Sequence, residues 1–236
     1  MRDQIQAILF DLDGTLLDAN MDVFLPRYFE ALTARVAHLI PPDRFISCLM
    51  QATEAMVTND GSGINQEVFA EAFYPLVGHS RQELEPIFAD FYANDFPRLR
   101  QYTRRKPEAQ QVVQAAFDQG YDMVIATNPL FPASAVEQRM EWAGVSSFAY
   151  RLVTTYENSR AAKPNLLYYQ QILTTIDHPP GACLVVGDED MDMVAAHLGC
   201  LTFLVPGPRT KLSPTTPAPT YRGTLADLLT LLRSQV

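Results

Sequence analysis

The sequence predicts an α/β protein with a doubly wound parallel sheet and an inserted α-helical cap domain. From about residue 107 onward, short apolar segments alternate with segments of helical periodicity, which is typical of a parallel sheet covered by helices. A long stretch before this region has apolar residues at helical spacing only. We therefore expect a core made of residues 1–16 and 99–236, and a cap at residues 17–98.

The first predicted strand covers about residues 6–11 and contains an apolar run typical of a strand buried on both faces. Asp11, Asp13 and Gly14 come at its end. Ligands of open parallel sheets bind beyond the carboxyl ends of the strands, so both carboxylates are expected at a binding edge. Two carboxylates this close repel, and a hard cation such as Mg²⁺ would compensate them. An ordinary Asp-Gly turn is the alternative.

Four helices are predicted within the cap, at about residues 26–40, 46–57, 66–77 and 80–91. Pro41 ends the first helix, and Asp43 is expected to cap the second. Ser80 begins a capping box that marks the start of the fourth.

The segment 58–65, between the second and third helices, has the composition of a loop. We expect this loop to meet the site, with Asp60 and Asn65 as substrate contacts. The cap as a whole contains twelve acidic residues and five arginines but no lysine. Most of this negative charge is expected on solvated helix faces, and it argues against a polyanionic substrate.

In the second half of the chain, strands are expected at residues 121–127, 148–154, 182–188 and 201–205, with helices at 107–119, 132–143, 164–176, 191–198 and 225–232. Gly120, Gly144 and Gly199 follow three of these helices, where glycine commonly ends a helix. The basic stretch at residues 98–106 is expected to be a solvated connector. A positive lip that steers phosphate esters is the alternative.

The composition argues against several classes of partner. The net charge of −9 does not suit binding to nucleic acid or to an anionic membrane. No apolar run approaches the ~20 residues of a membrane span, and the first residues lack the apolar stretch of a signal peptide. The three cysteines are far apart and include no Cys-x-x-Cys pair, which indicates buried thiols in a reducing compartment. We therefore expect a cytoplasmic protein.

Polar residues whose side chains could bind a ligand or react also lie beside the later strands and helices. Thr127 and Asn128 follow one strand, Lys163 precedes a helix, and Asp188 and Asp192 follow another strand. A carboxylate at a strand end with a second four residues on suits a metal site and the groups that support it. Each signal is weak alone, because polar residues commonly end strands and a lone lysine is usually a surface charge.

Taken in chain order, four segments resemble the four motifs of the haloacid dehalogenase (HAD) superfamily. They are DLDGT at residues 11–15, TN at 127–128, KP at 163–164 and GDEDMD at 187–192. The resemblance covers residues 6–16 and about 107–205, whereas the cap matches only as a helical insertion of the C1 type. It implies the HAD-like Rossmannoid core.

The resemblance also implies a role for each carboxylate. Asp11 would be the nucleophile and Asp13 the general acid and base. Asp11, the backbone carbonyl of Asp13, and Asp188 would hold Mg²⁺.

The remaining motif residues would support the phosphoryl group. Thr127 and Asn128 would bind its oxygens, and Lys163 would offset its charge. Asp192 would orient a metal-bound water or Lys163.

These roles describe a phosphomonoesterase that hydrolyses a small phosphorylated metabolite through an aspartyl-phosphate. A sugar phosphomutase of the same superfamily is an alternative, since it shares the core residues. A phosphoacceptor signalling domain is a second, although such domains are shorter and have no cap. Dehalogenases of the superfamily lack the carboxylate that Asp13 supplies, and a phosphonate hydrolase would need a lysine from the cap.

Overall fold

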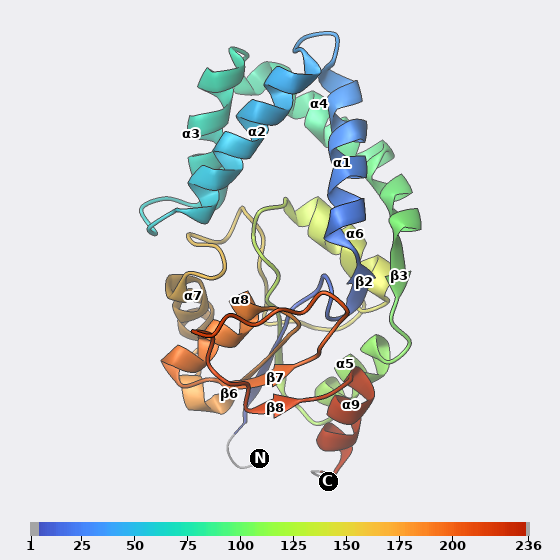
Figure 1. Ribbon diagram of the computed structural model, residues 1–236, viewed down its shortest axis with the longest axis vertical. Helices are drawn as coiled ribbons and strands as arrows, with labels where there is room; N and C mark the ends of the chain where they lie inside the picture. Colours follow the sequence, from blue (N-terminus) through green and yellow to red (C-terminus); the bar gives the residue numbers. More distant parts are fainter. Residues whose placement is uncertain (1–4, 235–236) are drawn as a thin grey trace.

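The fold is built on a six-stranded sheet whose strands run parallel, in the order β5-β4-β1-β6-β7-β8 (Figure 1). A computed structural model describes residues 5–234. The strands are β1 (Ala7–Phe10), β4 (Asp122–Ile125), β5 (Leu152–Val153), β6 (Cys183–Gly187), β7 (Leu201–Leu204) and β8 (Tyr221–Arg222). The predicted parallel α/β fold is confirmed, with β8 as an additional edge strand that the sequence did not indicate.

Helices cover both faces of the sheet, as a doubly wound fold requires. They are α5 (Ala109–Asp118), α6 (Ala133–Ala143) and α9 (Leu225–Arg233) on one face, and α7 (Leu166–Ile176) with α8 (Asp190–Met193) and the 3-10 helix η3 (Val194–Leu198) on the other. The central strand divides its side chains between these layers. Ile8 and Phe10 pack with the first set of helices, whereas Ala7 and Leu9 pack with the second.

Strand β1 is central and fully buried, so its end defines the middle of the sheet edge. Leu9 lies opposite Val124 of β4 and Val185 of β6 in the parallel ladders. Because the three strands run parallel and in register, the residues that follow them reach the same edge. This register brings residues that are far apart in the sequence to one place.

Four consecutive α-helices that follow β1 in the sequence stand beyond the carboxyl edge of the sheet (Figure 1). They are α1 (Met21–Val36), α2 (Pro42–Val57), α3 (Asn65–Val77) and α4 (Arg81–Asn94). Ser80 forms the predicted capping box with Glu83. The prediction for Asp43 was wrong, because α2 begins one residue earlier and Pro41 occupies the N-cap position. Asp43 lies in the first helical turn instead.

The two connections to these helices form an antiparallel ribbon of β2 (Leu17–Ala19) and β3 (Thr103–Arg105). The basic stretch is therefore structured, since it runs through the 3-10 helix η1 (Phe96–Tyr102) and β3. At its end, the Lys106 ammonium donates a hydrogen bond to the carbonyl oxygen of Gly14. The ribbon thus ties the helical insertion to the turn that follows β1.

Aromatic side chains join the inserted helices to the core. Phe96 stacks on Trp142 of α6 with ring centroids 5.4 Å apart, and its edge contacts Phe24 of α1 at 6.1 Å. All three rings are buried in one hydrophobic cluster that runs from the sheet into the inserted helices. This continuous packing fixes the insertion over the sheet edge.

All three cysteines are free and buried, as the sequence predicts. Within residues 5–234, the structure contains no helix with the length and apolar character needed to cross a membrane.

We expect Phe96→Ala to lower the free energy of unfolding by about 3–5 kcal/mol, because it removes the ring that joins α1 to α6. The matched control is Phe117→Ala, whose side chain is 47 % exposed and should cost less than about 1 kcal/mol. Urea denaturation of both variants measures the difference. Equal losses would contradict the role given to Phe96.

Candidate active site

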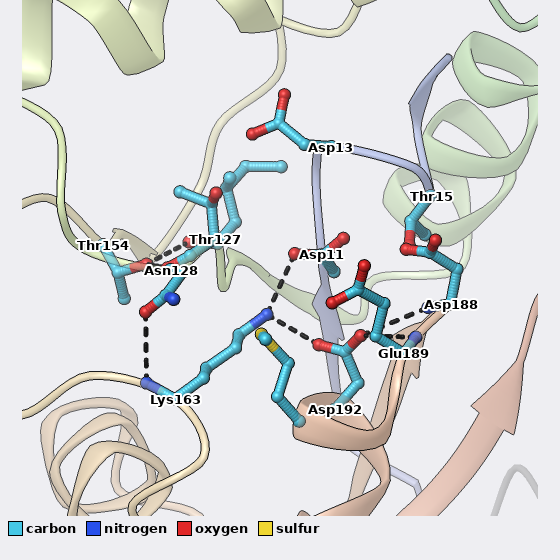
Figure 2. Close-up of polar contacts among 12 residues, drawn as sticks. Asp11, Asp13, Thr15, Thr127, Asn128, Thr154, Lys163, Asp188, Glu189 and Asp192 are labelled. Carbon is cyan, nitrogen blue, oxygen red and sulfur yellow. Dashed lines mark hydrogen bonds and ion pairs between the residues drawn. The ribbon is translucent and has the colours of Figure 1, made fainter. Parts of the chain in front are cut away.

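A buried lysine holds two carboxylates together at the sheet edge (Figure 2). The Lys163 ammonium donates to Asp11 at 2.9 Å and to Asp192 at 2.6 Å. Burial by itself would lower the pKa of Lys163, but the two carboxylates outweigh burial and hold its pKa well above the usual value. The ammonium therefore stays charged.

Three carboxylates from two strand ends form a compact cluster. Oxygen atoms of Asp11, Asp188 and Asp192 lie within 4.8 Å of one another. The hydroxyl of Thr15 donates to Asp188 at 3.0 Å. Burial, together with the charges of Asp11 and Asp192, raises the pKa of Asp188 to about 8. The cluster thus carries more negative charge than its surroundings compensate.

This arrangement of oxygen donors fits a hard divalent cation. Both oxygens of Asp192 are already engaged, one by Lys163 and the other by the backbone amides of Asp188 and Glu189 at 3.2 Å. Asp11 and Asp188 are therefore the carboxylates best placed to hold the cation. The raised pKa of Asp188 indicates that a positive charge at this point would stabilise the ionised site.

Gly14 allows the chain to turn close to this cluster. Its φ is +91°, in the left-handed region that side chains disfavour, and a Cβ atom here would overlap the Asp188 carboxylate. The short Asp-Gly turn and the carboxylate cluster therefore depend on each other. An ordinary Asp-Gly turn on the surface would not bring the backbone this close to a second carboxylate.

Asp13 forms a buried ion pair that the sequence did not predict. Its carboxylate accepts from the guanidinium of Arg139, a residue of α6 that is 1 % exposed and lies against the ring of Phe131. Burial raises the pKa of Asp13, and the nearby Asp11 carboxylate adds to this, while Arg139 opposes it. One oxygen of Asp13 is buried without a hydrogen-bond partner among the described residues.

The sequence of α6 does indicate that Arg139 is buried. Arg139 lies between Ala135 and Ala143 at intervals of four residues, and both alanines face the core. A charged residue on such an apolar stripe needs a buried partner. The partner is 126 residues earlier in the chain, so the sequence alone did not identify it.

Thr127 and Asn128 lie just beyond the end of β4, beside the other motif residues (Figure 2). The Thr127 carbonyl accepts from the hydroxyl groups of Thr154 at 2.7 Å and Tyr168 at 2.9 Å, which fixes its backbone. The Asn128 side chain accepts from the backbone amide of Lys163 at 3.1 Å. Asn128 thus connects two of the segments that form the site.

The structure does not bring Asp60 and Asn65 to the site. Asn65 is fully buried as the first residue of α3, where its amide donates to the carbonyl oxygens of Pro129 and Ala161 at 3.2 and 3.3 Å. It therefore anchors the helix rather than ending a loop as expected. Asp60 is exposed and accepts from the backbone amide of Ser62 at 3.0 Å. Neither residue lines the cavity described next.

A cavity of about 440 Å³ opens above the carboxylates, between the sheet edge and the inserted helices. Its floor contains residues of all the strand-end motifs, namely Asp11, Asp13, Thr127, Asn128, Asp188 and Asp192. Glu189 also lines it. The floor places candidate nucleophiles, acids and a cation site within one enclosed space.

Comparison with known proteins gives a consistent assignment. The family model for haloacid dehalogenase-like hydrolases matches residues 5–198. A phosphoglycolate phosphatase from Vibrio parahaemolyticus is 24 % identical over 200 residues, which cover 84 % of this chain and 82 % of that protein.

Two solved structures share the fold over almost the whole chain. A HAD phosphatase from Thermococcus onnurineus has a TM-score of 0.61 and 16 % identity, with 97 % of this chain and 98 % of that one covered. An L-2-haloacid dehalogenase from Xanthobacter autotrophicus has a TM-score of 0.58 and 16 % identity, with 98 % and 100 % covered.

We expect Asp188→Asn to stabilise the metal-free protein. The folded-state pKa of about 8 lies above the usual 3.8, so stability is lost as the pH rises from about 4 to about 8. Removing the carboxyl group should raise the free energy of unfolding by on the order of 1–3 kcal/mol at pH 8, and by less at pH 5.

Urea denaturation in EDTA at both pH values measures this effect. Glu71→Gln, on the exposed surface of α3, is the matched control and should change little. Adding Mg²⁺ should then raise the melting temperature of the unmodified protein but not that of the Asp188 variant. If Asp188→Asn were less stable than the unmodified protein at pH 8, this would contradict the excess of negative charge that we assign to the carboxylate cluster.

Proposed function

The chain belongs to the haloacid dehalogenase-like hydrolase family, and on that premise we propose that it hydrolyses phosphate monoesters through an aspartyl-phosphate on Asp11. One observation carries the proposal. Asp11 is held by Lys163, and Asp13, two residues on, has a raised pKa that suits an acid. The phosphoglycolate phosphatases among its relatives support a phosphate ester as the substrate.

In the first step, an oxygen of Asp11 attacks phosphorus and the bond from phosphorus to the ester oxygen breaks. Lys163 already binds one oxygen of Asp11, which leaves the other available to attack. Asp13 gives its proton to the departing alkoxide. In the second step, Asp13 takes a proton from the water that attacks the aspartyl-phosphate, which releases phosphate and restores the Asp11 carboxylate and the protonated Asp13.

The surroundings of Asp13 support this proton transfer. Arg139 binds one of its oxygens and fixes the direction of the side chain, while the other oxygen has no hydrogen-bond partner among the described residues. Burial keeps the pKa of Asp13 above that of an exposed aspartate. A carboxyl group that retains its proton in this way is better able to protonate an alkoxide.

We propose Mg²⁺ as the cation, held by Asp11, Asp188 and the backbone carbonyl of Asp13. When bound, it supplies positive charge to the phosphoryl oxygens. Thr127 and the segment at Asn128 would donate hydrogen bonds to the same oxygens. Asp192 would hold Lys163 in place through its contact of 2.6 Å.

Asp13 also separates this proposal from a dehalogenase reaction. A halide is a weak base and departs without a proton, whereas an alkoxide needs one. A buried aspartate with a raised pKa beside the nucleophile therefore favours an ester over a haloacid. A sugar phosphomutase would use the same groups, and its product would be an isomeric ester rather than free phosphate.

We expect Asp11→Asn to lower phosphate release by at least about a thousandfold, because the amide cannot form the acyl phosphate. The assay is a panel of phosphorylated metabolites with p-nitrophenyl phosphate, each run with Mg²⁺ and with EDTA. Asp43→Asn, an exposed aspartate of α2, is the matched control and should keep full activity. Undiminished turnover by the Asp11 variant would contradict the mechanism, and an isomeric ester as product would indicate the mutase.

We expect the cost of Asp13→Asn to depend on the leaving group. The kcat/KM for a primary alkyl phosphate should fall by roughly 100- to 10,000-fold, because the alkoxide leaves without its proton. The kcat/KM for p-nitrophenyl phosphate should fall much less, because p-nitrophenolate is a far weaker base. Equal losses on both esters would argue against Asp13 as the acid.

A further inference from the structure

The walls of the cavity are apolar, in contrast to its charged floor. Helices α1 to α4 and the segment after β4 contribute aliphatic and aromatic side chains, among them Leu25, Phe29, Leu32, Phe69, Phe88 and Phe131. The four helices and the segment after β4 thus surround the cavity on several sides, so these side chains form its walls and not an isolated exposed patch. Such walls favour an apolar ligand group by the hydrophobic effect.

The polar groups in the walls bind mainly to one another. The hydroxyl groups of Tyr28 and Tyr92 lie 2.9 Å apart, and the hydroxyl of Thr53 donates to the carbonyl of Leu49 at 2.8 Å. Burial raises the pKa of Tyr28 to about 12, so this phenol stays neutral. These groups therefore offer little to a charged ligand.

Positive charge is scarce around the cavity. Among the described residues that line it, Arg139 is the one cationic side chain. One of its terminal nitrogens binds Asp13, and the other has no hydrogen-bond partner among the described residues. Three arginines of the cap, Arg27, Arg35 and Arg81, form ion pairs with acidic residues and do not line the cavity. A second anionic group on a substrate would therefore find one guanidinium at most as a counter-charge, and elsewhere in the cavity it would lie against apolar walls, which is costly.

From these walls we infer that the substrate is the phosphate monoester of a bulky, uncharged and mainly apolar alcohol. Its phosphoryl group lies at Asp11 and its apolar part fills the cavity beneath the cap helices. The inference rests on the proposed phosphatase function and specifies its substrate class.

The size of the cavity also argues against the substrate named for the curated relatives. Cavities of roughly 300–1,000 Å³ usually hold drug-sized ligands, and this one measures about 440 Å³. Phosphoglycolate carries only a two-carbon acid. It would leave most of the apolar wall in contact with water.

The test is a series of n-alkyl phosphates from ethyl to octyl, assayed by phosphate release. Primary alkoxides have nearly equal basicity, so differences in kcat/KM report on the contacts of the chain. Each methylene moved from water to an apolar wall should raise kcat/KM about fourfold. Hexyl phosphate should thus exceed ethyl phosphate on the order of 100-fold.

Two charged esters complete the series. We expect 5-carboxypentyl phosphate, which adds a terminal carboxylate to a chain of similar length, to fall on the order of 100-fold below hexyl phosphate. Phosphoglycolate should be a poor substrate as well.

A pair of variants links the preference to the cavity. Met50 lines the cavity from α2 and is 49 % exposed, so Met50→Glu can place a carboxylate at the wall with little loss of packing. It should reduce the hexyl-to-ethyl ratio at least about tenfold. Val23→Glu on α1 is the control, since Val23 is 44 % exposed and does not line the cavity, and it should leave the ratio unchanged.

The possible outcomes distinguish a failure of the inferred substrate class from a failure of the proposed phosphatase function. A flat series, or a preference for phosphoglycolate, with turnover that still requires Asp11, would overturn the substrate class and leave the phosphatase function in place. An unchanged hexyl-to-ethyl ratio in Met50→Glu would also overturn it. If none of the esters, including p-nitrophenyl phosphate, were hydrolysed in an Asp11-dependent reaction, the phosphatase function itself would fail and the inference with it.

Discussion

The contact of the Lys163 ammonium with Asp11 and Asp192 is the interaction on which the site depends. The parallel sheet brings acidic residues from the ends of β1 and β6 to one edge, where each carboxylate opposes the ionisation of the others. The single buried ammonium of Lys163 offsets part of this charge and sets the position of Asp11. Asn128 in turn fixes the backbone at Lys163, so the segments after β1, β4 and β6 are joined through the backbone and the side chain of this one residue.

Much of this edge could be predicted because it follows from strand direction alone. Asp11, Thr127 and Asp188 are far apart in the sequence, but each follows an apolar segment that reads as a buried strand. Parallel strands place such residues together whatever separates them in the chain. The ribbon of β2 and β3 and the two-residue β8 were not predicted, because strands this short form only where tertiary contacts support them.

Side-chain partners were harder to predict than positions. Arg139 has the sequence character of a solvated helical residue, and only its place on a buried stripe indicates otherwise. Asn65 shows the reverse error, because its polar neighbours suggested a ligand contact while its amide binds two backbone carbonyls. Local composition identifies a polar side chain, but it does not distinguish a ligand from a backbone group as the partner. Tertiary packing makes that choice.

The charged floor and the apolar walls of the cavity also explain where the charge of the inserted helices lies. Residues 17–98 contain twelve acidic residues and no lysine, which by itself indicates only that polyanionic substrates are disfavoured. In the structure, several of these acids pair with arginines on the outer surface, as Asp90 does with Arg35 and Glu85 with Arg81. The inner faces of the same helices are left to aliphatic and aromatic side chains. If the chain acts as we propose, the apolar inner faces of these helices disfavour a second anionic group, while the sheet edge keeps the groups that a phosphoryl transfer needs.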